Sequence, residues 1–198
     1  MLRLMGSQRH VHNLALIGFM GTGKSSVGRL VAARLQFRFL DTDDLIEERA
    51  RRPITEIFAH EGEGFFRQME RQVVAELGRY RRTVIATGGG LAANESNLAS
   101  LKRHALVVCL WASPEAIWRR VCHQTHRPLL HDPDPRARIR NLLARREPFY
   151  KQADVLINTE WRSIRAVADQ VLLQFRLARQ SYCPGETHSG STRVGTGL

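Results

Sequence analysis

The sequence predicts an α/β fold in which a parallel sheet is covered by helices on both faces. Two observations lead to this expectation. Short apolar runs alternate with segments of helical periodicity from Leu14 to about Ala178, which is the pattern of parallel strands joined by crossover helices. Polar and glycine-rich motifs follow the first three apolar runs, and ligands of such sheets bind beyond the carboxyl ends of the strands. One pocket is therefore expected to collect these motifs.

The elements of the first half of the chain follow from apolar spacing. Strands are expected at short apolar runs, and helices where apolar residues recur three and four positions apart, as Val27, Leu30 and Val31 do. Pro53 is expected to stop the second helix, because proline cannot donate the next hydrogen bond. In chain order we expect strand 14–17, helix 25–35, strand 37–40, helices 45–52, 54–60 and 65–80, and strand 83–86.

The second half repeats the alternation and has clearer helix boundaries. Asn94 can cap a helix, and Pro114 occupies the first turn of another, where its missing N–H costs nothing. Pro148 is expected to end the helix before it. In chain order we expect helix 95–103, strand 105–110, helices 114–123 and 136–147, strand 155–157 and helix 163–178.

The domain organisation is simple. The 198 residues, 43% of them hydrophobic, suffice for one sizeable core, so residues 12–178 are expected to form one domain. Residues 1–11 form a short polar N-terminal extension, and residues 179–198, rich in Gly, Ser and Thr, are expected to be a disordered tail. Residues 124–135 break the periodicity with charged residues and prolines, which predicts a mobile surface loop.

The chain is basic, with a formal net charge of +11 carried almost entirely by arginine. A basic protein binds nucleic acid or handles small anions. The sequence contains no basic region with heptads, no aromatic RNA-binding signature and no zinc finger. Its arginines are instead spread along helical segments such as 48–52 and 136–146, where a solvated face is the simpler interpretation. We therefore expect no nucleic-acid partner.

The sequence indicates a cytoplasmic protein. Cys109, Cys122 and Cys183 are scattered and odd in number, which favours reduced thiols, and their spacing does not match a metal site. The N-terminus lacks the apolar stretch of a secretory signal. Because no apolar run reaches the length of a membrane span, we expect no membrane partner.

The segment Gly18–Ser25 carries the strongest chemical signal. It fits G-x-x-x-x-G-K-[ST], and it lies between an expected strand and an expected helix, as a phosphate-binding loop must. Its glycines let successive backbone N–H groups turn toward an anion, and the helix N-terminus adds partial positive charge. Lys24 can reach the outer phosphates, and the Ser25 hydroxyl can bind magnesium. A nucleoside triphosphate with Mg²⁺ is the expected ligand.

Asp41 and Asp43 follow the second strand, two residues apart, and project in one direction. One carboxylate can serve magnesium, and the other can accept a proton from an attacking hydroxyl. The alternative is that Asp43 or Asp44 only caps a helix beginning at Leu45.

Arginine is the other recurrent element. Guanidinium groups stabilise the charge that spreads over a transferring phosphoryl group, and they bind carboxylates through two parallel hydrogen bonds. Arg67, Arg127 and Arg146 each lie near a motif or a helix breaker, although each alone would more often be a surface residue.

Together these motifs resemble those of bacterial shikimate kinases, within the nucleoside-monophosphate-kinase-like P-loop group. The resemblance covers about residues 12–178. The combination of Asp-Thr-Asp, Phe-Arg, Gly-Gly-Gly, Arg-Pro-Leu-Leu and Arg-x-Pro-x-Tyr is far more specific than the phosphate loop alone. The matching stretches are 18–29, 39–43, 57–63, 66–70, 87–90, 127–130 and 146–150.

The resemblance implies a three-layer P-loop kinase fold with a five-stranded parallel sheet in the order 2-3-1-4-5, helices on both faces and a mobile lid at about 124–135. It implies transfer of the γ-phosphate of ATP to the 3-hydroxyl of shikimate, in the chorismate route to aromatic amino acids. The expected small-molecule partners are therefore shikimate and ATP, the expected cofactor is Mg²⁺, and the protein is expected to be a monomer.

The resemblance also implies roles for individual residues. Asp43 would accept the proton, assisted by Lys24 and the lid residue Arg127, while Ser25 and Asp41 would serve Mg²⁺. Glu70 would orient Arg67, and the adenine would lie against Arg120, near Ile164. ATP would contact Gly21, Thr22, Gly23, Lys24, Ser25, Ser26, Arg120 and Arg127. Shikimate would contact Asp43, Arg67, Gly88, Gly89, Gly90 and Arg146, the two arginines binding its carboxylate.

Two other kinds of function remain open at this point. A gluconate or nucleotide kinase of the same fold would keep Gly18–Ser25 but would not need Arg67, Arg146 and the three glycines together. A non-catalytic nucleotide-binding regulator, or a basic nucleic-acid binder that uses ATP as a switch, would bind nucleotide without transferring phosphate.

Overall fold

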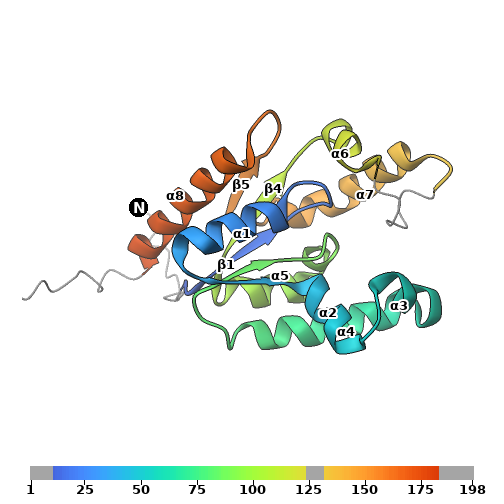
Figure 1. Cartoon of the computed structure of the whole chain (residues 1–198), viewed down its shortest axis with the longest axis horizontal. Coiled ribbons are helices and arrows are strands. Elements are labelled where there is room, and N and C mark those ends of the chain that lie inside the picture. The colour runs from blue at the N-terminus through green and yellow to red at the C-terminus, as the bar shows by residue number, and fades with distance from the viewer. Residues whose placement is uncertain (1–10, 124–131, 183–198) are drawn as a thin grey trace, which may run out of the picture.

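A computed structural model describes residues 11–123 and 132–182. Their strands form one parallel five-stranded sheet in the order β2-β3-β1-β4-β5, with helices on both faces (Figure 1). The expected fold class and strand order are therefore confirmed. The strands are β1 (Asn13–Ile17), β2 (Arg38–Asp41), β3 (Thr83–Ala86), β4 (Ala105–Trp111) and β5 (Val155–Asn158).

Most helices lie close to their predicted positions. Asn94 caps its helix, because its side chain accepts a hydrogen bond from the backbone N–H of Asn97, and Pro114 begins the next. The helices are α1 (Lys24–Leu35), α2 (Thr42–Ala50), α3 (Ile54–His60), α4 (Gly62–Leu77), α5 (Glu95–Lys102), α6 (Pro114–Val121), α7 (Pro135–Tyr150) and α8 (Ile164–Tyr182), with a short 3₁₀ turn at Leu91–Ala93.

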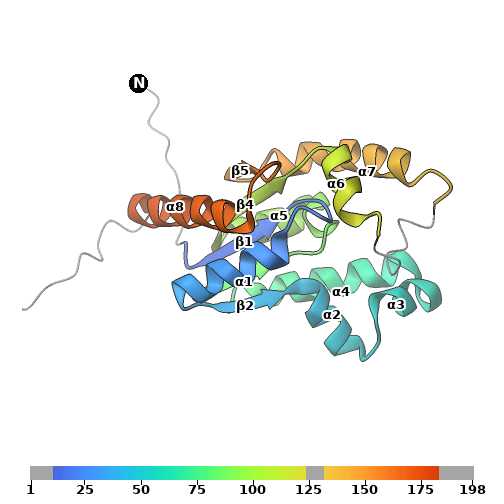
Figure 2. The same ribbon diagram turned by 45° about the horizontal axis from the view of Figure 1, so that its top comes forward.

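The sheet separates two hydrophobic layers, because the side chains of β1 alternate between its faces. Leu14 and Leu16 pack with residues of α1 and α8 on one face. Ala15 and Ile17 pack on the other face with residues of α4, α5, α6 and α7. All five residues of β1 are buried, and Figure 2 shows α1 and α8 side by side on one side of the sheet. The central strand is therefore a rigid support for the loop that follows it.

The register brings three strand ends to the same edge of the sheet. Leu16 of β1 and Asp41 of β2 are both paired with Ala86 of β3. Because the strands are parallel, the loops that follow them leave the sheet side by side. The phosphate-loop segment, the acidic pair and the glycine run are thereby placed next to one another.

The second helix begins earlier than predicted. We expected it to start at Leu45, but α2 starts at Thr42, directly after β2. The Asp41 carboxylate caps it by accepting a hydrogen bond from the backbone N–H of Asp43 at 3.1 Å. The alternative role for Asp43 or Asp44 as the cap is therefore wrong. Likewise α4 starts at Gly62 rather than at 65 and ends at Leu77 rather than at 80.

Helix α7 passes through the proline that was expected to end it. We predicted an end at Glu147, but α7 continues through Pro148 to Tyr150. Pro148 cannot donate to the carbonyl of Ala144, a loss that costs about 3 kcal/mol in a helix interior. Tertiary contacts offset that cost, because Tyr150 is 1% exposed and its hydroxyl donates to the Gly89 carbonyl at 2.6 Å.

The C-terminal helix is longer than predicted. We expected residues from 179 onward to be disordered, but α8 continues to Tyr182. Most of the predicted lid, including Arg127, lies outside the described residues, as do the N-terminal extension to residue 10 and the chain after residue 182. Within the described part of the chain, no helix is long and apolar enough to cross a bilayer.

Candidate active site

The loop between β1 and α1 has the backbone of an anion-binding turn. Gly23, the N-cap of α1, has φ 91°, a left-handed conformation that glycine adopts without strain. A side chain at Gly18 would collide with the carbonyl of Leu110 in β4. Inside the loop, the Thr22 hydroxyl and the Lys24 ammonium donate to the Phe19 carbonyl at 2.8 and 2.9 Å. The loop is thus held in shape at the positive end of α1.

The acidic pair is connected to this loop. The Ser25 hydroxyl donates to Oδ2 of Asp41 at 2.7 Å, while Oδ1 of Asp41 caps α2. Asp41 is therefore held from both sides next to the first turn of α1. Burial and the neighbouring Asp41 charge raise the pKa of Asp44, partly offset by Arg29.

A cavity of about 330 Å³ brings the phosphate loop and the acidic pair together. Arg120 closes one side of it by donating to the Gly21 carbonyl at 3.1 Å and to the Thr159 carbonyl at 2.7 Å. Arg120 therefore joins the phosphate loop to the turn between β5 and α8. The lining residues are Met20, Gly21, Gly23, Lys24, Ser25, Ser26, Asp41, Asp43, Thr87, Gly89 and Arg120.

The glycine run after β3 lets three functional groups approach one backbone turn. The backbone N–H of Gly88 donates to the buried Thr42 hydroxyl at 2.9 Å, which ties the turn to the start of α2. A side chain at Gly88 would collide with Oδ1 of Asp43, and one at Gly90 would lie 2.7 Å from Nη1 of Arg67.

The middle glycine of the run is held through its carbonyl oxygen. The Gly89 carbonyl accepts hydrogen bonds from Nη1 of Arg146 at 3.2 Å and from the Tyr150 hydroxyl at 2.6 Å. Both donors belong to the last turns of α7. The run therefore connects α2, α4 and α7.

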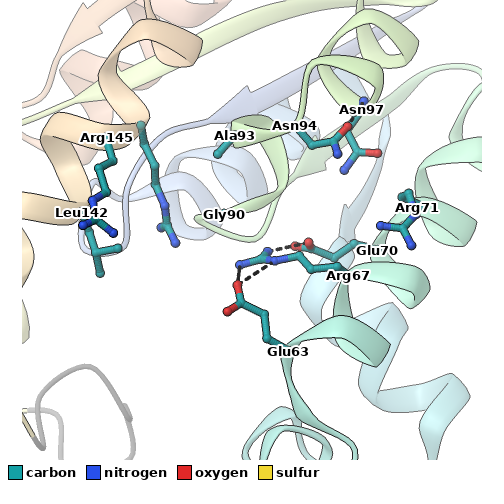
Figure 3. Close-up of a pocket in the computed structure, with 11 residues that line it drawn as sticks. Glu63, Arg67, Glu70, Arg71, Gly90, Ala93, Asn94, Asn97, Leu142 and Arg145 are labelled. Atoms are coloured by element: carbon teal, nitrogen blue, oxygen red, sulfur yellow. Dashed lines mark hydrogen bonds and ion pairs between the residues drawn. The ribbon is translucent and has the colours of Figure 1, made fainter.

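A second cavity, of about 320 Å³, is lined by Gly90 of this run and is rich in arginine. Figure 3 shows Arg67, Glu63 and Glu70 of α4 across the cavity from Leu142 and Arg145 of α7. Arg67 donates to Glu70 at 2.6 Å, and the Arg146 guanidinium lies 5.5 Å from the centre of the Phe19 ring. The lining residues are Glu63, Arg67, Glu70, Arg71, Gly90, Ala93, Asn94, Asn97, Leu142, Arg145 and Arg146.

Burial and pairing change the titration of the groups around these cavities. Burial raises the pKa of the Glu70 carboxyl, although the charges of Arg67 and Arg146 act against it. Burial acts to lower the pKa of Arg67, but the charges and hydrogen bonds of Glu70 and Glu63 outweigh it, so the net shift is upward. Burial raises the pKa of the Cys109 thiol to about 12, despite the charge of Lys24. Arg67 therefore stays a cation, and Cys109 stays an inert thiol.

The structure distributes the predicted site residues over two neighbouring cavities. The acidic pair, Arg120 and the predicted phosphate-loop residues other than Thr22 line the first, and Arg67 and Arg146 line the second. Thr22 and Gly88 are not among the lining residues of either cavity. The glycine run belongs to both, because Gly89 lines the first and Gly90 the second. Arg127 cannot be placed, since it lies outside the described residues. Ile164, expected near the adenine, begins α8 and is half exposed.

The sequence analysis gave no role to several residues that line the second cavity or hold the glycine run. Glu63, Arg71 and Arg145 line the second cavity, and Thr42 and Tyr150 hold the glycine run. A signal for Glu63 was present, because a glutamate four residues before an arginine on a helix contacts it. No local pattern reveals Arg71 or Arg145, whose places depend on how α4 and α7 face each other.

The phosphate loop, its parallel sheet and the arginine-rich cavity beside it define a P-loop kinase. The family model described as shikimate kinase matches residues 20–176. A shikimate kinase of Caldanaerobacter subterraneus is 45% identical over 160 residues, which cover 81% of this chain and 94% of the relative. One from Moorella thermoacetica is 46% identical over 80% of this chain and 91% of its own length. The chain belongs to the shikimate kinase family.

Solved structures agree with this assignment. The shikimate kinase of Acinetobacter baumannii, in complex with shikimate, superposes with a TM-score of 0.81 at 37% identity, over 86% of this chain and 95% of that chain. A gluconokinase from Sinorhizobium meliloti superposes with a TM-score of 0.64 at 19% identity, over 90% of this chain and 99% of that chain. The second likeness reflects the fold alone.

Proposed function

We propose that this protein transfers the γ-phosphate of ATP to the 3-hydroxyl of shikimate, giving shikimate 3-phosphate and ADP for the chorismate pathway. The observation that carries the proposal is the pair of guanidinium groups, Arg67 and Arg146, that line a cavity together with Gly90 of the glycine run. Asp43 and the phosphate loop line the neighbouring cavity, together with Gly89 of the same run. An acceptor with a carboxylate at one end and a hydroxyl at the other can reach both.

On the nucleotide side, the backbone amides at the start of α1 and the ammonium of Lys24 would bind the phosphates. Gly21, Thr22, Gly23, Ser25 and Ser26 supply the rest of the loop, and Arg120 would lie against the adenine. Arg127 would contribute a further positive charge to the transferring phosphoryl group.

The donor set around Ser25 and Asp41 fits a magnesium ion. A hydroxyl and a carboxylate are hard oxygen ligands, and they lie 2.7 Å apart beside the phosphate loop. Mg²⁺ usually keeps several waters and is bound through one or two carboxylates and the phosphates of the substrate. When bound, Mg²⁺ would neutralise charge on the phosphates.

On the acceptor side, Arg67 and Arg146 would hold the shikimate carboxylate, with backbone of Gly88, Gly89 and Gly90 beside it. Asp43 would accept the proton of the attacking hydroxyl. As that O–H bond breaks, the hydroxyl oxygen bonds to the γ-phosphorus, and the bond from phosphorus to the bridging oxygen breaks to release ADP. Holding the two reactants in line supplies much of the acceleration.

A coupled assay of ADP release tests the proposed acceptor. Turnover should depend on shikimate and should be absent with gluconate or nucleoside monophosphates. The absence of shikimate-dependent turnover would overturn the proposal.

We further propose that the protein is cytoplasmic, acts as a monomer and has no nucleic-acid or membrane partner.

Replacement of Asp43 tests its role as the base. Asp43→Asn keeps the size of the side chain but cannot accept the proton, so kcat should fall by about two to four orders of magnitude. ATP binding should change only modestly, because the phosphates are held by the loop. Steady-state kinetics and a nucleotide-binding titration measure the two effects. Survival of turnover would mean that Asp43 is not the base.

A further inference from the structure

Arg67 forms ion pairs with two carboxylates of its own helix, and the two differ in exposure and in hydrogen bonding. Glu70 is buried, with a side chain 2% exposed, and accepts one hydrogen bond from Nη1 at 2.6 Å. Glu63 is 66% exposed, and its single oxygen Oε1 accepts from both Nε at 3.1 Å and Nη2 at 2.9 Å (Figure 3). Glu63 therefore lies on the edge of the guanidinium formed by Nε and Nη2.

The other edge of the guanidinium is closed. A Cβ built on Gly90 would lie 2.7 Å from Nη1, 2.9 Å from Nη2 and 3.2 Å from Cζ of Arg67. The backbone of the glycine run therefore lies against the end formed by Nη1 and Nη2, where not even a methyl group fits. A carboxylate that binds Arg67 through two parallel hydrogen bonds needs two adjacent N–H groups. The edge held by Glu63 is the one that remains.

We propose that Glu63 is an intramolecular competitor for the acceptor's carboxylate. It occupies the Nε and Nη2 edge of Arg67 and must leave before shikimate can bind there. This inference rests on the proposed function, because it takes the acceptor to be a carboxylate held by Arg67.

The structure shows why Glu63 can leave while Glu70 stays. Glu63 stands in the first turn of α4, faces solvent and uses one oxygen for both hydrogen bonds. An incoming carboxylate offers two oxygens to the same edge and forms a straighter pair of bonds. Glu70, by contrast, is buried beneath the guanidinium and keeps it in place during the exchange. Glu70 is thus the positioning residue of Arg67, and Glu63 is its exchangeable partner.

With competition of this kind, the apparent affinity is the intrinsic affinity multiplied by the fraction of molecules in which the edge is open. An exposed ion pair of this type favours the closed state by a factor of about two to five. The edge is then open in about one third to one sixth of the molecules, so removing the competitor should lower the apparent dissociation constant for shikimate about three- to six-fold.

Glu63→Gln is the test, because it keeps the shape of the side chain and removes its charge. The KM for shikimate and the dissociation constant measured by calorimetric titration should both fall about three- to six-fold. The KM for ATP should stay within about twofold, and kcat should change less than the KM for shikimate. Glu76→Gln is a matched control. Glu76 is also an exposed glutamate of α4, 39% exposed, and pairs with Arg49 at 2.6 Å.

The outcomes separate three interpretations. A fall in KM in Glu63→Gln but not in Glu76→Gln supports competition. An increase in the KM for shikimate in Glu63→Gln would mean that Glu63 helps to place Arg67 for the substrate. An equal fall in this KM in both variants would mean a general effect of charge. Either result overturns the inference but leaves the proposed function intact. If the wild-type protein neither binds nor phosphorylates shikimate, the proposed function fails, and the inference fails with it.

Discussion

At the scale of single residues, the glycine run is defined by what lies against each of its members. Gly88 faces Asp43, and Gly90 faces Arg67. A Cβ built on Gly89 would lie 3.3 Å from the backbone nitrogen of Met20. The sequence showed three consecutive glycines after a strand but not what they accommodate. The reason is that these contacts come from three other elements, which only the packed fold brings to the run.

Gly90→Ala should separate binding from stability. The φ of Gly90 is −100°, which alanine adopts readily, so the backbone is not strained. The three atoms nearest to the new methyl group all belong to the flexible end of Arg67, which must move away. We expect the KM for shikimate to increase by about tenfold, as for the loss of a hydrogen bond to a charged group, with an unfolding midpoint close to that of the wild type.

A matched control for this variant exists on α4. A Cβ on Gly64 would meet nothing within 4 Å, so Gly64→Ala should leave the KM for shikimate unchanged. Its free energy of unfolding should increase by up to about 1 kcal/mol, because alanine favours the helix. An unchanged KM in Gly90→Ala would contradict the assigned place of Arg67.

At the scale of elements, local patterns predicted the interior of the fold better than its boundaries. The bounds of β3, 83–86, and the cap at Asn94 were predicted correctly, because apolar runs and caps are local signals. The start of α2 and the end of α7 were predicted incorrectly. The Thr42 hydroxyl meets the N–H of Gly88, 46 residues away, and Tyr150 meets the carbonyl of Gly89, 61 residues away. No local pattern contains such contacts.

The last turn of α7 therefore depends on Tyr150. Tyr150→Phe keeps the buried ring but removes the hydrogen bond to the Gly89 carbonyl. The free energy of unfolding should fall by about 1 kcal/mol, and the KM for shikimate should increase a few-fold, because Arg146 and the glycine run lose a common support. Urea denaturation and steady-state kinetics measure the two effects. In Tyr80→Phe, a control whose ring lies against Arg38, the KM should not change.

At the scale of the whole molecule, the positive charge is partly concentrated at the cavity where the proposed function places an anionic group. Arg67, Arg71, Arg145 and Arg146 all line the second cavity. Other arginines pair on the surface, as Arg49 does with Glu76. A net charge of +11 thus accords with a protein that handles small anions, and the concentration of arginine at one cavity focuses the field that attracts them.

Because the two cavities have no lining residue in common, their ligands should stabilise the molecule separately. A ligand at about 100 times its dissociation constant adds about 2.7 kcal/mol to the free energy of unfolding. For a chain of this size that corresponds to an increase of roughly 5–10 °C in Tm.

Arg146→Ala removes a guanidinium from the second cavity only. At the concentrations used for the wild type, its Tm increase with shikimate should fall to about 1 °C, as for a hundredfold weaker ligand, while that with ADP and magnesium persists. Loss of the ADP response with an intact shikimate response would place Arg146 on the nucleotide side and contradict the division of the site.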